Sequence, residues 1–343
     1  MIRFDSDYIE GCHERVLEAL VKTNMEQHAG YGMDSHCARA AQLIKSACDF
    51  PDAAVHFLVG GTQTNTIVIA SVLRPYEGVV CCSSGHINCH ETGAIESCGH
   101  KVLALEQVEG KLEAATLDQQ VAAWRGDVNY EHIVQPGMVY LSQPTEYGTM
   151  YSRGELEEIY AVCQKYDLPL FIDGARLGYA LAADESLTLP DIARLCDVFY
   201  IGGTKVALLF GEAVVITNPA LKKDFRSMMK QHGAMLAKGR LLGVQFETMF
   251  EDGLYLEVSR NAIRAARKIR AALLEKGIPL LMDSPTNQLF PILTKAQQAA
   301  LGENFALGMW DLTGGEADAL RICTSWATTE ENADALIAAI KAL

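Results

Sequence analysis

Lys205 is the residue whose surroundings most clearly indicate reactive chemistry. It lies in DVFYIGGTKVALLFGEAVVIT, residues 197–217, after a strand-like run and two glycines. The apolar residues that follow it do not resemble a solvated surface. Burial lowers the pKa of a lysine and favours the free amine, which can form an imine with a carbonyl carbon. The segment therefore predicts a Schiff-base lysine, whereas an isolated lysine would ordinarily be a surface residue.

A second segment, LPLFIDGARLG at residues 168–178, places Asp173 at the C-terminal end of a buried strand. Ligand sites of α/β proteins occur at that edge of the sheet. A buried carboxylate needs a partner, and the protonated pyridine nitrogen of pyridoxal phosphate (PLP) is one, because the ring acts as an electron sink. Arg176 can bind a substrate carboxylate as a bidentate fork. A structural ion pair between Asp173 and Arg176 is the alternative.

Two further turns fit the same cofactor. HFLVGGTQTN, residues 56–65, runs from an apolar strand through two glycines into a helix, and free N–H groups there can bind phosphate. An ordinary strand–turn–helix joint with a threonine N-cap is the alternative. His86, in CCSSGHINCHETGA, can stack on a planar ring. A core or capping histidine, or a metal site on His86, Cys89 and His90, also fits, but no second ligand pair with metal spacing appears, so no metal is expected.

Short apolar runs alternate with helical periodicity along most of the chain. The strand-like runs are residues 54–59, 78–82, 139–142, 168–172, 198–201 and 213–217. This alternation predicts an α/β fold with a central, mostly parallel sheet flanked by helices, plus a small C-terminal α+β domain. The expected division is an N-terminal segment beside the active site (1–50), a large cofactor-binding domain (51–245) and a small domain (246–343).

Composition narrows the class of protein. The 343 residues carry a formal net charge of −14, which disfavours nucleic acid and anionic membranes as partners. No apolar run approaches the roughly 18 residues of a membrane span, and the first residues do not resemble a signal peptide. Ten cysteines without a CxxC pair indicate reduced thiols and a cytoplasmic protein.

The motifs in this order resemble the threonine aldolase and β-eliminating lyase group of fold-type I PLP enzymes. The matching elements are FDSDYIEG near the N-terminus, Tyr31-Gly32-x-Asp34, GTQTN, the GH of SSGH followed by Glu91, DGARL and the late lysine. The resemblance covers nearly the whole chain. It implies a fold-type I architecture and a homodimer or homotetramer with shared active sites.

The resemblance also implies a role for each matched residue. Gly61, Thr62 and Gln63 correspond to the phosphate-binding turn, His86 to the ring-stacking histidine, Asp173 to the partner of the pyridine nitrogen, and Lys205 to the Schiff-base lysine preceded by the hydroxyl of Thr204. Ser6, Arg176 and Arg321 correspond to groups that hold the substrate carboxylate. Tyr31 corresponds to a residue that reaches a neighbouring subunit's site, and Lys238 or Arg240 to a group that reaches the phosphate across the same interface.

One departure concerns Glu146 in SQPTEYG, where the family usually has a histidine near the substrate hydroxyl. The implied reaction is cleavage of the Cα–Cβ bond of a β-hydroxy-α-amino acid to glycine and an aldehyde. Glu146, His86 or a water held by them would be the base. A β-eliminating lyase and a non-catalytic binding protein of the same fold are the alternatives. A dinucleotide-binding dehydrogenase is disfavoured, because no G-x-G-x-x-G follows the first strand.

Overall fold

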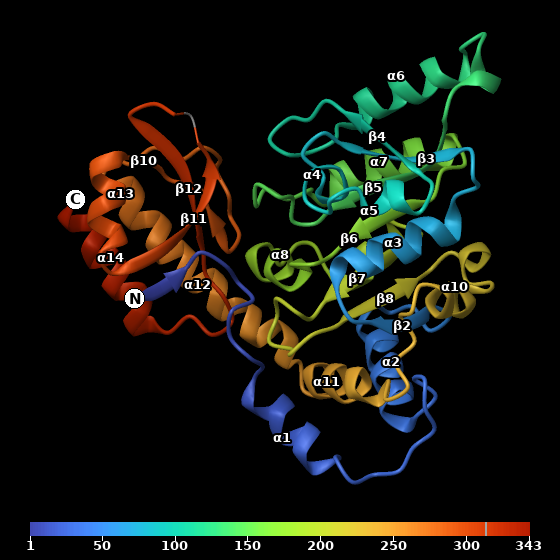
Figure 1. Ribbon diagram of the computed structural model, residues 1–343, viewed down its shortest axis with the longest axis horizontal. Coiled ribbons are helices and arrows are strands. Elements are labelled where there is room, and N and C mark those ends of the chain that lie inside the picture. Colours follow the sequence, from blue (N-terminus) through green and yellow to red (C-terminus); the bar gives the residue numbers. More distant parts are fainter. Residues whose placement is uncertain (313) are drawn as a thin grey trace.

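The computed structural model describes residues 1–312 and 314–343 and shows an α/β protein with two β-sheets (Figure 1). The larger sheet has the strand order β2-β8-β7-β6-β5-β3-β4. Its strands are β2 (Ala54–Leu58), β3 (Glu77–Cys82), β4 (Lys101–Leu105), β5 (Gln135–Ser142), β6 (Leu170–Asp173), β7 (Val198–Gly202) and β8 (Glu212–Ile216). Neighbouring strands are parallel, except that β8 runs antiparallel to both β2 and β7. The predicted fold class is therefore confirmed.

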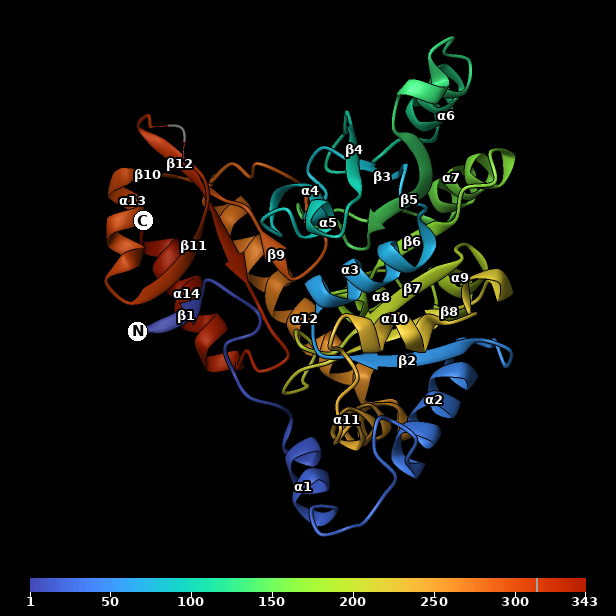
Figure 2. The same cartoon turned by 45° about the vertical axis from the view of Figure 1, so that its right-hand side comes forward.

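Helices cover both faces of this sheet, which explains why its central strands are apolar throughout. Along β5, Val139 and Leu141 belong to one core, whereas Met138 and Tyr140 belong to the other. Helices α3 (Gly61–Val72), α4 (His86–Cys89), α5 (Ala94–Ser97) and α10 (Phe225–Gln231) contribute to the second core, and α3 and α10 lie side by side (Figure 2). The first core is covered by α1 (Glu14–Lys22), α2 (Ser35–Ala47), α6 (Ala114–Arg125), α7 (Arg153–Lys165), α8 (Leu177–Ala183), α9 (Leu189–Arg194) and α11 (Arg240–Glu251).

The second sheet lies beside a long helix, α12 (Leu254–Glu275), which runs from the large sheet to the C-terminal part of the chain (Figure 1). Its strands are β1 (Ile2–Phe4), β9 (Gln288–Leu289), β10 (Ile292–Thr294), β11 (Phe305–Asp311) and β12 (Ala317–Cys323), and α13 (Lys295–Gly302) and α14 (Glu330–Ala342) complete this part. Because β1 pairs with β11, the first residues of the chain join the C-terminal sheet. The domain boundaries at residues 50 and 245 stay a prediction.

One edge of the large sheet collects most of the predicted site residues. Ser142 at the end of β5 is paired in register with Asp173 at the end of β6. At the same edge, Gly202 ends β7 and is paired with Glu212, which begins β8 and is also paired with Leu58. In the described residues, no helix has both the length and the apolar composition of a membrane-spanning segment.

Candidate active site

A cavity of about 290 Å³ opens at this edge of the sheet, a size suited to a small ligand. It is lined by side chains from the ends of several strands and from the N-terminal segment. They include eight of the predicted site residues, namely Gly61, Thr62, His86, Glu146, Asp173, Arg176, Thr204 and Lys205. The topology thus brings residues from Tyr8 to Glu212, 204 positions apart, to one cavity.

Lys205 follows β7 and presents its amine to the cavity. In the described part of the chain, its Nζ has no hydrogen bond or ion pair, and the nearest aromatic face is that of Tyr8, 5.9 Å away. Burial and the neighbouring Arg176 guanidinium lower the pKa of Lys205, against the opposing effect of nearby carboxylates. The Tyr179 hydroxyl donates to the Lys205 carbonyl at 2.5 Å, which fixes the backbone. The amine is therefore positioned and unengaged, as an imine-forming lysine requires.

Asp173 is held as a buried carboxylate by four donors. Tyr200 Oη and the Ala175 N–H donate to Oδ1, and Tyr140 Oη and Asn65 Nδ2 donate to Oδ2 at 2.6 and 3.0 Å. Burial raises the pKa of Asp173, but the nearby His86 and these hydrogen bonds outweigh it and leave the pKa below its usual range. The carboxylate is thus an anion at neutral pH.

His86 is oriented by a buried hydrogen-bonded chain that leads back to Asp173. Its Nδ1 lies 2.7 Å from Glu91 Oε1, and Asn65 Nδ2 donates to that same oxygen at 2.7 Å. Asn65 therefore links the carboxylate beside the imidazole to the carboxylate of Asp173. A carboxylate on one ring nitrogen fixes the tautomer and the orientation of an imidazole. The metal alternative on this segment loses one ligand atom, because Nδ1 is already bound.

The glycine turn before α3 also lines the cavity, through Gly60, Gly61 and Thr62. Gly60 is extended and α3 begins at Gly61, so the N–H groups of Gly61, Thr62 and Gln63 have no partner within the helix. A side chain at Gly61 would place a Cβ 3.1 Å from the Tyr200 hydroxyl. Gln63 turns back, and its Oε1 accepts from the Val59 N–H at 3.3 Å. The turn provides backbone donors and a positive helix end, which suit a phosphate.

Glu146 lies in the loop after β5, against the His86 turn. Its Oε1 accepts from the His86 N–H at 2.9 Å and from Ser142 Oγ at 2.5 Å, while Oε2 is buried and has no partner in the described residues. Burial, with a smaller contribution from Asp173, raises the pKa of Glu146 despite these bonds. One oxygen of this carboxylate is thus available for a proton.

Arg176 makes a bidentate contact, but its partner is Asp7 rather than Asp173. Nε and Nη2 donate to the two oxygens of Asp7 at 2.6 and 3.0 Å, and Asn287 Nδ2 donates to Asp7 Oδ2 at 2.9 Å. The Asp173–Arg176 ion pair considered as an alternative is therefore wrong. Burial raises the pKa of Asp7, but Arg176 reverses this and holds it at about 2. The pair fixes the N-terminal segment against the cavity.

Ser6 and Arg321 offer buried donors without partners in the described residues. Ser6 Oγ and Arg321 Nε are both buried and unbonded. Arg321 Nη2 donates to the Asp5 carbonyl at 3.1 Å, and its guanidinium lies 5.6 Å from the Trp310 ring. Unsatisfied buried groups are rare and point to a missing ligand or water. Both residues are thus suited to hold a carboxylate.

Thr204 and Glu212 hydrogen-bond to each other and to the backbone of the turn that carries Lys205. Thr204 Oγ1 donates to Glu212 Oε1 at 2.8 Å and accepts from the Gly211 N–H at 3.0 Å. Glu212 Oε2 accepts from the Gly203 N–H at 3.1 Å, and burial raises the pKa of Glu212 to about 8. The hydroxyl of Thr204 therefore stabilises the turn that carries Lys205.

Six predicted residues do not line this cavity. Three of them, Ser6, Gln63 and Arg321, belong to segments described above, and the other three, Tyr31, Lys238 and Arg240, make their contacts elsewhere in the protomer. Tyr31 lines a different cavity, with its ring 4.9 Å from Lys230 Nζ. The guanidinium of Arg240 donates to the carbonyls of Thr23 and Asn24, and Lys238 is exposed. Their expected action on a neighbouring subunit's site stays a prediction.

Several site residues had no assigned role in the sequence. They are Asp7, Tyr8, Asn65, Tyr140, Tyr200, Glu212 and, for its contact with His86, Glu91. Asp7, Asn65 and Glu91 belong to the quoted motifs FDSD, GTQTN and HETG, so their position in those motifs was a usable signal. Tyr140 and Tyr200 lie within strand-like apolar runs, where the sequence does not distinguish them from ordinary core residues.

Comparison with known proteins agrees with this geometry. The profile of the family described as "Beta-eliminating lyase" matches residues 4–296. A low specificity L-threonine aldolase from Pseudomonas sp. is 30% identical, with 99% of this chain and 97% of that protein covered. The solved structure of Leishmania major threonine aldolase is 45% identical, with a TM-score of 0.96 over 100% of this chain and 99% of that one. Serine palmitoyltransferase from S. paucimobilis, solved with bound PLP, shares the fold with a TM-score of 0.70 at 15% identity, over 99% of this chain and 86% of that one.

The fold and the cavity define a lyase of the fold-type I, PLP-dependent class. The chain belongs to the β-eliminating lyase family. The predicted resemblance is confirmed, and the family together with its structural neighbours points to PLP as the cofactor.

Proposed function

We propose that this chain binds PLP and cleaves the Cα–Cβ bond of a β-hydroxy-α-amino acid, releasing glycine and an aldehyde. The observation that carries the proposal is the unengaged amine of Lys205 in the same cavity as the buried anion Asp173. The free helix end at Gly61–Gln63 and the oriented imidazole of His86 complete the donor set. Because an anion, an amine, an aromatic face and a phosphate cradle share one cavity, these residues fit PLP.

When bound, PLP supplies the electron sink that accepts the charge left on the substrate's Cα. Asp173 would hold the proton on the pyridine nitrogen, and Lys205 would hold the cofactor and release it to the substrate amine. The lowered pKa of Lys205 favours its unprotonated, nucleophilic form. Thr62 and Gly61 would bind the phosphate through their N–H groups.

Ser6 and Arg321 would bind the substrate carboxylate and so orient the bond that breaks. Their unbonded buried donors, Ser6 Oγ and Arg321 Nε, support this assignment. Arg176 would act mainly through Asp7, by fixing the N-terminal segment that carries Ser6.

Arg321→Ala is expected to raise the KM for the amino acid by about ten- to a hundredfold, because a charge-assisted hydrogen bond contributes about 1.5–3 kcal/mol. The cofactor absorbance should not change. Steady-state kinetics and cofactor titration measure the two effects. Arg260→Ala is the matched control, since Arg260 is exposed and contacts Glu185 at 3.4 Å. An Arg321→Ala variant that loses cofactor but keeps its KM would refute the assignment.

Glu146 would take the proton of the β-hydroxyl through its unbonded Oε2. The pKa of Glu146 is raised, and the ionised carboxylate is the form that can accept a proton. Turnover should therefore increase as pH rises through this pKa, which lies above the ordinary value of about 4.3. His86, or a water bound by it, is the other candidate base.

Glu146→Gln is expected to reduce turnover about tenfold and to remove this acidic limb of the pH profile, with cofactor binding unchanged. The loss should be smaller than the full effect of a general base, about 10²–10⁴-fold, because a water held by His86 can substitute in part. The exposed Glu157→Gln is the control. Profiles of Glu146→Gln and parent that coincide across the pH range would show that Glu146 only supports the His86 turn.

A neighbouring cavity of about 480 Å³ shares Glu146 with the site and would receive the substrate's β-substituent. His90, Tyr147 and Trp310 line it, and the Trp310 ring lies 5.6 Å from that of Tyr147. These aromatic walls suit substituents larger than methyl. A panel of β-hydroxy and β-substituted amino acids, with aldehyde, keto acid and ammonia all measured, tests the substrate and the reaction together. Ammonia and keto acid as the main products would favour β-elimination instead.

We also propose a homodimer or homotetramer with shared sites, in which Tyr31 reaches the partner's cavity and Lys238 or Arg240 its phosphate. Tyr31 is exposed and so can contact a second subunit, and its left-handed backbone, uncommon for a residue other than glycine, is typical of functional positions. A cytoplasmic location fits the ten unpaired cysteines.

A further inference from the structure

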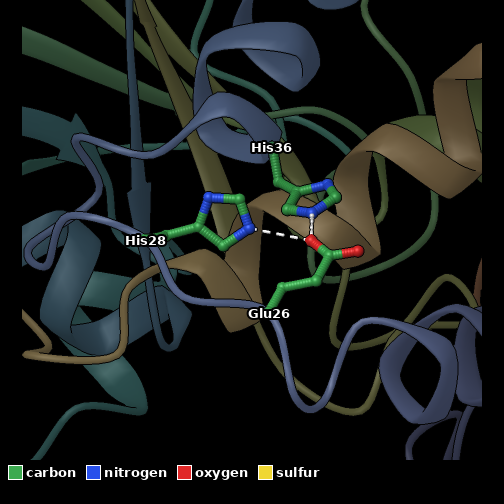
Figure 3. A group of neighbouring side chains, drawn as sticks. All are labelled: Glu26, His28 and His36. Atoms are coloured by element: carbon green, nitrogen blue, oxygen red, sulfur yellow. Dashed lines mark hydrogen bonds and ion pairs between the residues drawn. The ribbon is translucent and has the colours of Figure 1, made fainter.

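Glu26, His28 and His36 form a compact cluster away from the active site, on the segment before α2 and at its first turn (Figure 3). Both imidazoles point at one carboxylate oxygen. Glu26 Oε2 lies 2.8 Å from His28 Nε2 and 2.9 Å from His36 Nε2. All three ligand atoms lie within 4.8 Å of one another, and among the described residues this is the one such group of histidine, cysteine and carboxylate side chains.

His36 has a carboxylate at each ring nitrogen. Its Nδ1 lies 2.6 Å from Glu247 Oε2 on α11, and its Nε2 faces Glu26. A neutral imidazole donates from only one nitrogen. One of the two contacts therefore needs either an additional proton, on the ring or on the carboxylate, or a cation between Nε2 and Glu26.

A cation between His36 Nε2 and Glu26 would match a known pattern of metal sites. A metal-bound histidine usually donates its other ring N–H to a carboxylate, which fixes the ring. Glu247 is placed to accept that bond from His36. Two imidazole nitrogens and a carboxylate are ligands suited to Zn²⁺ and similar divalent transition metals, with a water in the fourth position.

Binding a metal ion would require the ligand atoms, which lie within 4.8 Å of one another, to move to the separations of a tetrahedral site. Tetrahedral zinc ligands at about 2.0–2.1 Å from the metal lie roughly 3.4 Å apart. The two observed separations would therefore each widen by about half an ångström. Glu26 can move by this amount because its side chain is 43% exposed, whereas the rings of His28 and His36 are 19% and 17% exposed.

We propose that Glu26, His28 and His36 bind one divalent transition-metal ion, with Glu247 orienting His36. The site would tie the segment of residues 24–34, which includes Tyr31, to α2 and α11. It revises the expectation of no metal, which rested on cysteine and histidine spacing around His86. Because the cluster does not line the cavity of its own chain, the role we assign to the ion is to hold this segment in place.

The test uses tag-free holoenzyme, stripped with EDTA and dialysed, then titrated with Zn²⁺ in a calorimeter and with Co²⁺ in a spectrophotometer. We expect one equivalent per chain and a Co²⁺ spectrum without a thiolate charge-transfer band. This band separates the cluster from the chain's free cysteines. His28→Gln and His36→Gln should each weaken binding by at least about tenfold, and Glu247→Ala by about 10–100-fold as an outer partner.

His132→Gln, at an exposed histidine outside the cluster, is the matched control and should bind as the parent does. Absence of binding by the parent would overturn the proposal and leave the cluster as a charged hydrogen-bonded group. Equal affinities in the parent, His28→Gln and His36→Gln would also overturn it, as would a thiolate band.

Discussion

Lys205→Ala is expected to abolish turnover, with a loss of at least about a thousandfold, in the upper part of the range for a positioned catalytic group. The reason is that Nζ of Lys205 is the one amine lining the cavity among the described residues. Borohydride treatment should attach the cofactor covalently to the parent and not to the variant. Mass spectrometry of the peptide that contains residue 205 measures this directly.

The variant should still fold, because the backbone around Lys205 is held by Tyr179 and the Glu212–Thr204 contacts rather than by the amine. Thermal unfolding in the absence of cofactor checks this point. Lys165→Ala, at a lysine that is 55% exposed and pairs with Asp118, is the matched control and should retain activity. A Lys205→Ala protein that still turns over substrate after dialysis would refute the assignment.

Lys205 and Asp173 could be predicted from the sequence because their signals are local. Each follows a short buried strand, and the carboxyl ends of parallel strands meet at one edge of a sheet. Six of the seven strands of the large sheet were predicted for the same reason, since burial on both faces makes them continuous apolar runs between turns. The seventh, β4, was missed, because it lies at the edge of the sheet and its Lys101 and Ala104 are exposed. The glycine turn before α3 and the position of His86 after β3 belong to the same edge.

The partners of these residues were harder to predict because they come from distant parts of the chain. Asp7 and Arg176 are 169 positions apart, and no periodicity connects them. Tyr140 and Tyr200 lie in buried strands, as aromatic residues of the core do. Only the fold shows that their hydroxyls both bond to Asp173. The pairing of β1 with β11 likewise joins the two ends of the chain in one sheet.

Asp173→Asn is expected to keep the cofactor bound and to reduce turnover by about a hundredfold or more, the usual effect of removing one preorganised electrostatic partner. An amide can still bond to the Tyr140 and Tyr200 hydroxyls, although its NH2 group would face the donor of either Ala175 or Asn65. It cannot hold the proton on the pyridine nitrogen, because it carries no charge. Asp197→Asn is the matched control, since Asp197 is a buried carboxylate that accepts from the Leu170 N–H at 2.8 Å outside the cavity. Near-normal turnover of Asp173→Asn, compared per folded molecule with Asp197→Asn, would show that Asp173 serves only as a structural hydrogen-bond acceptor for the two tyrosines.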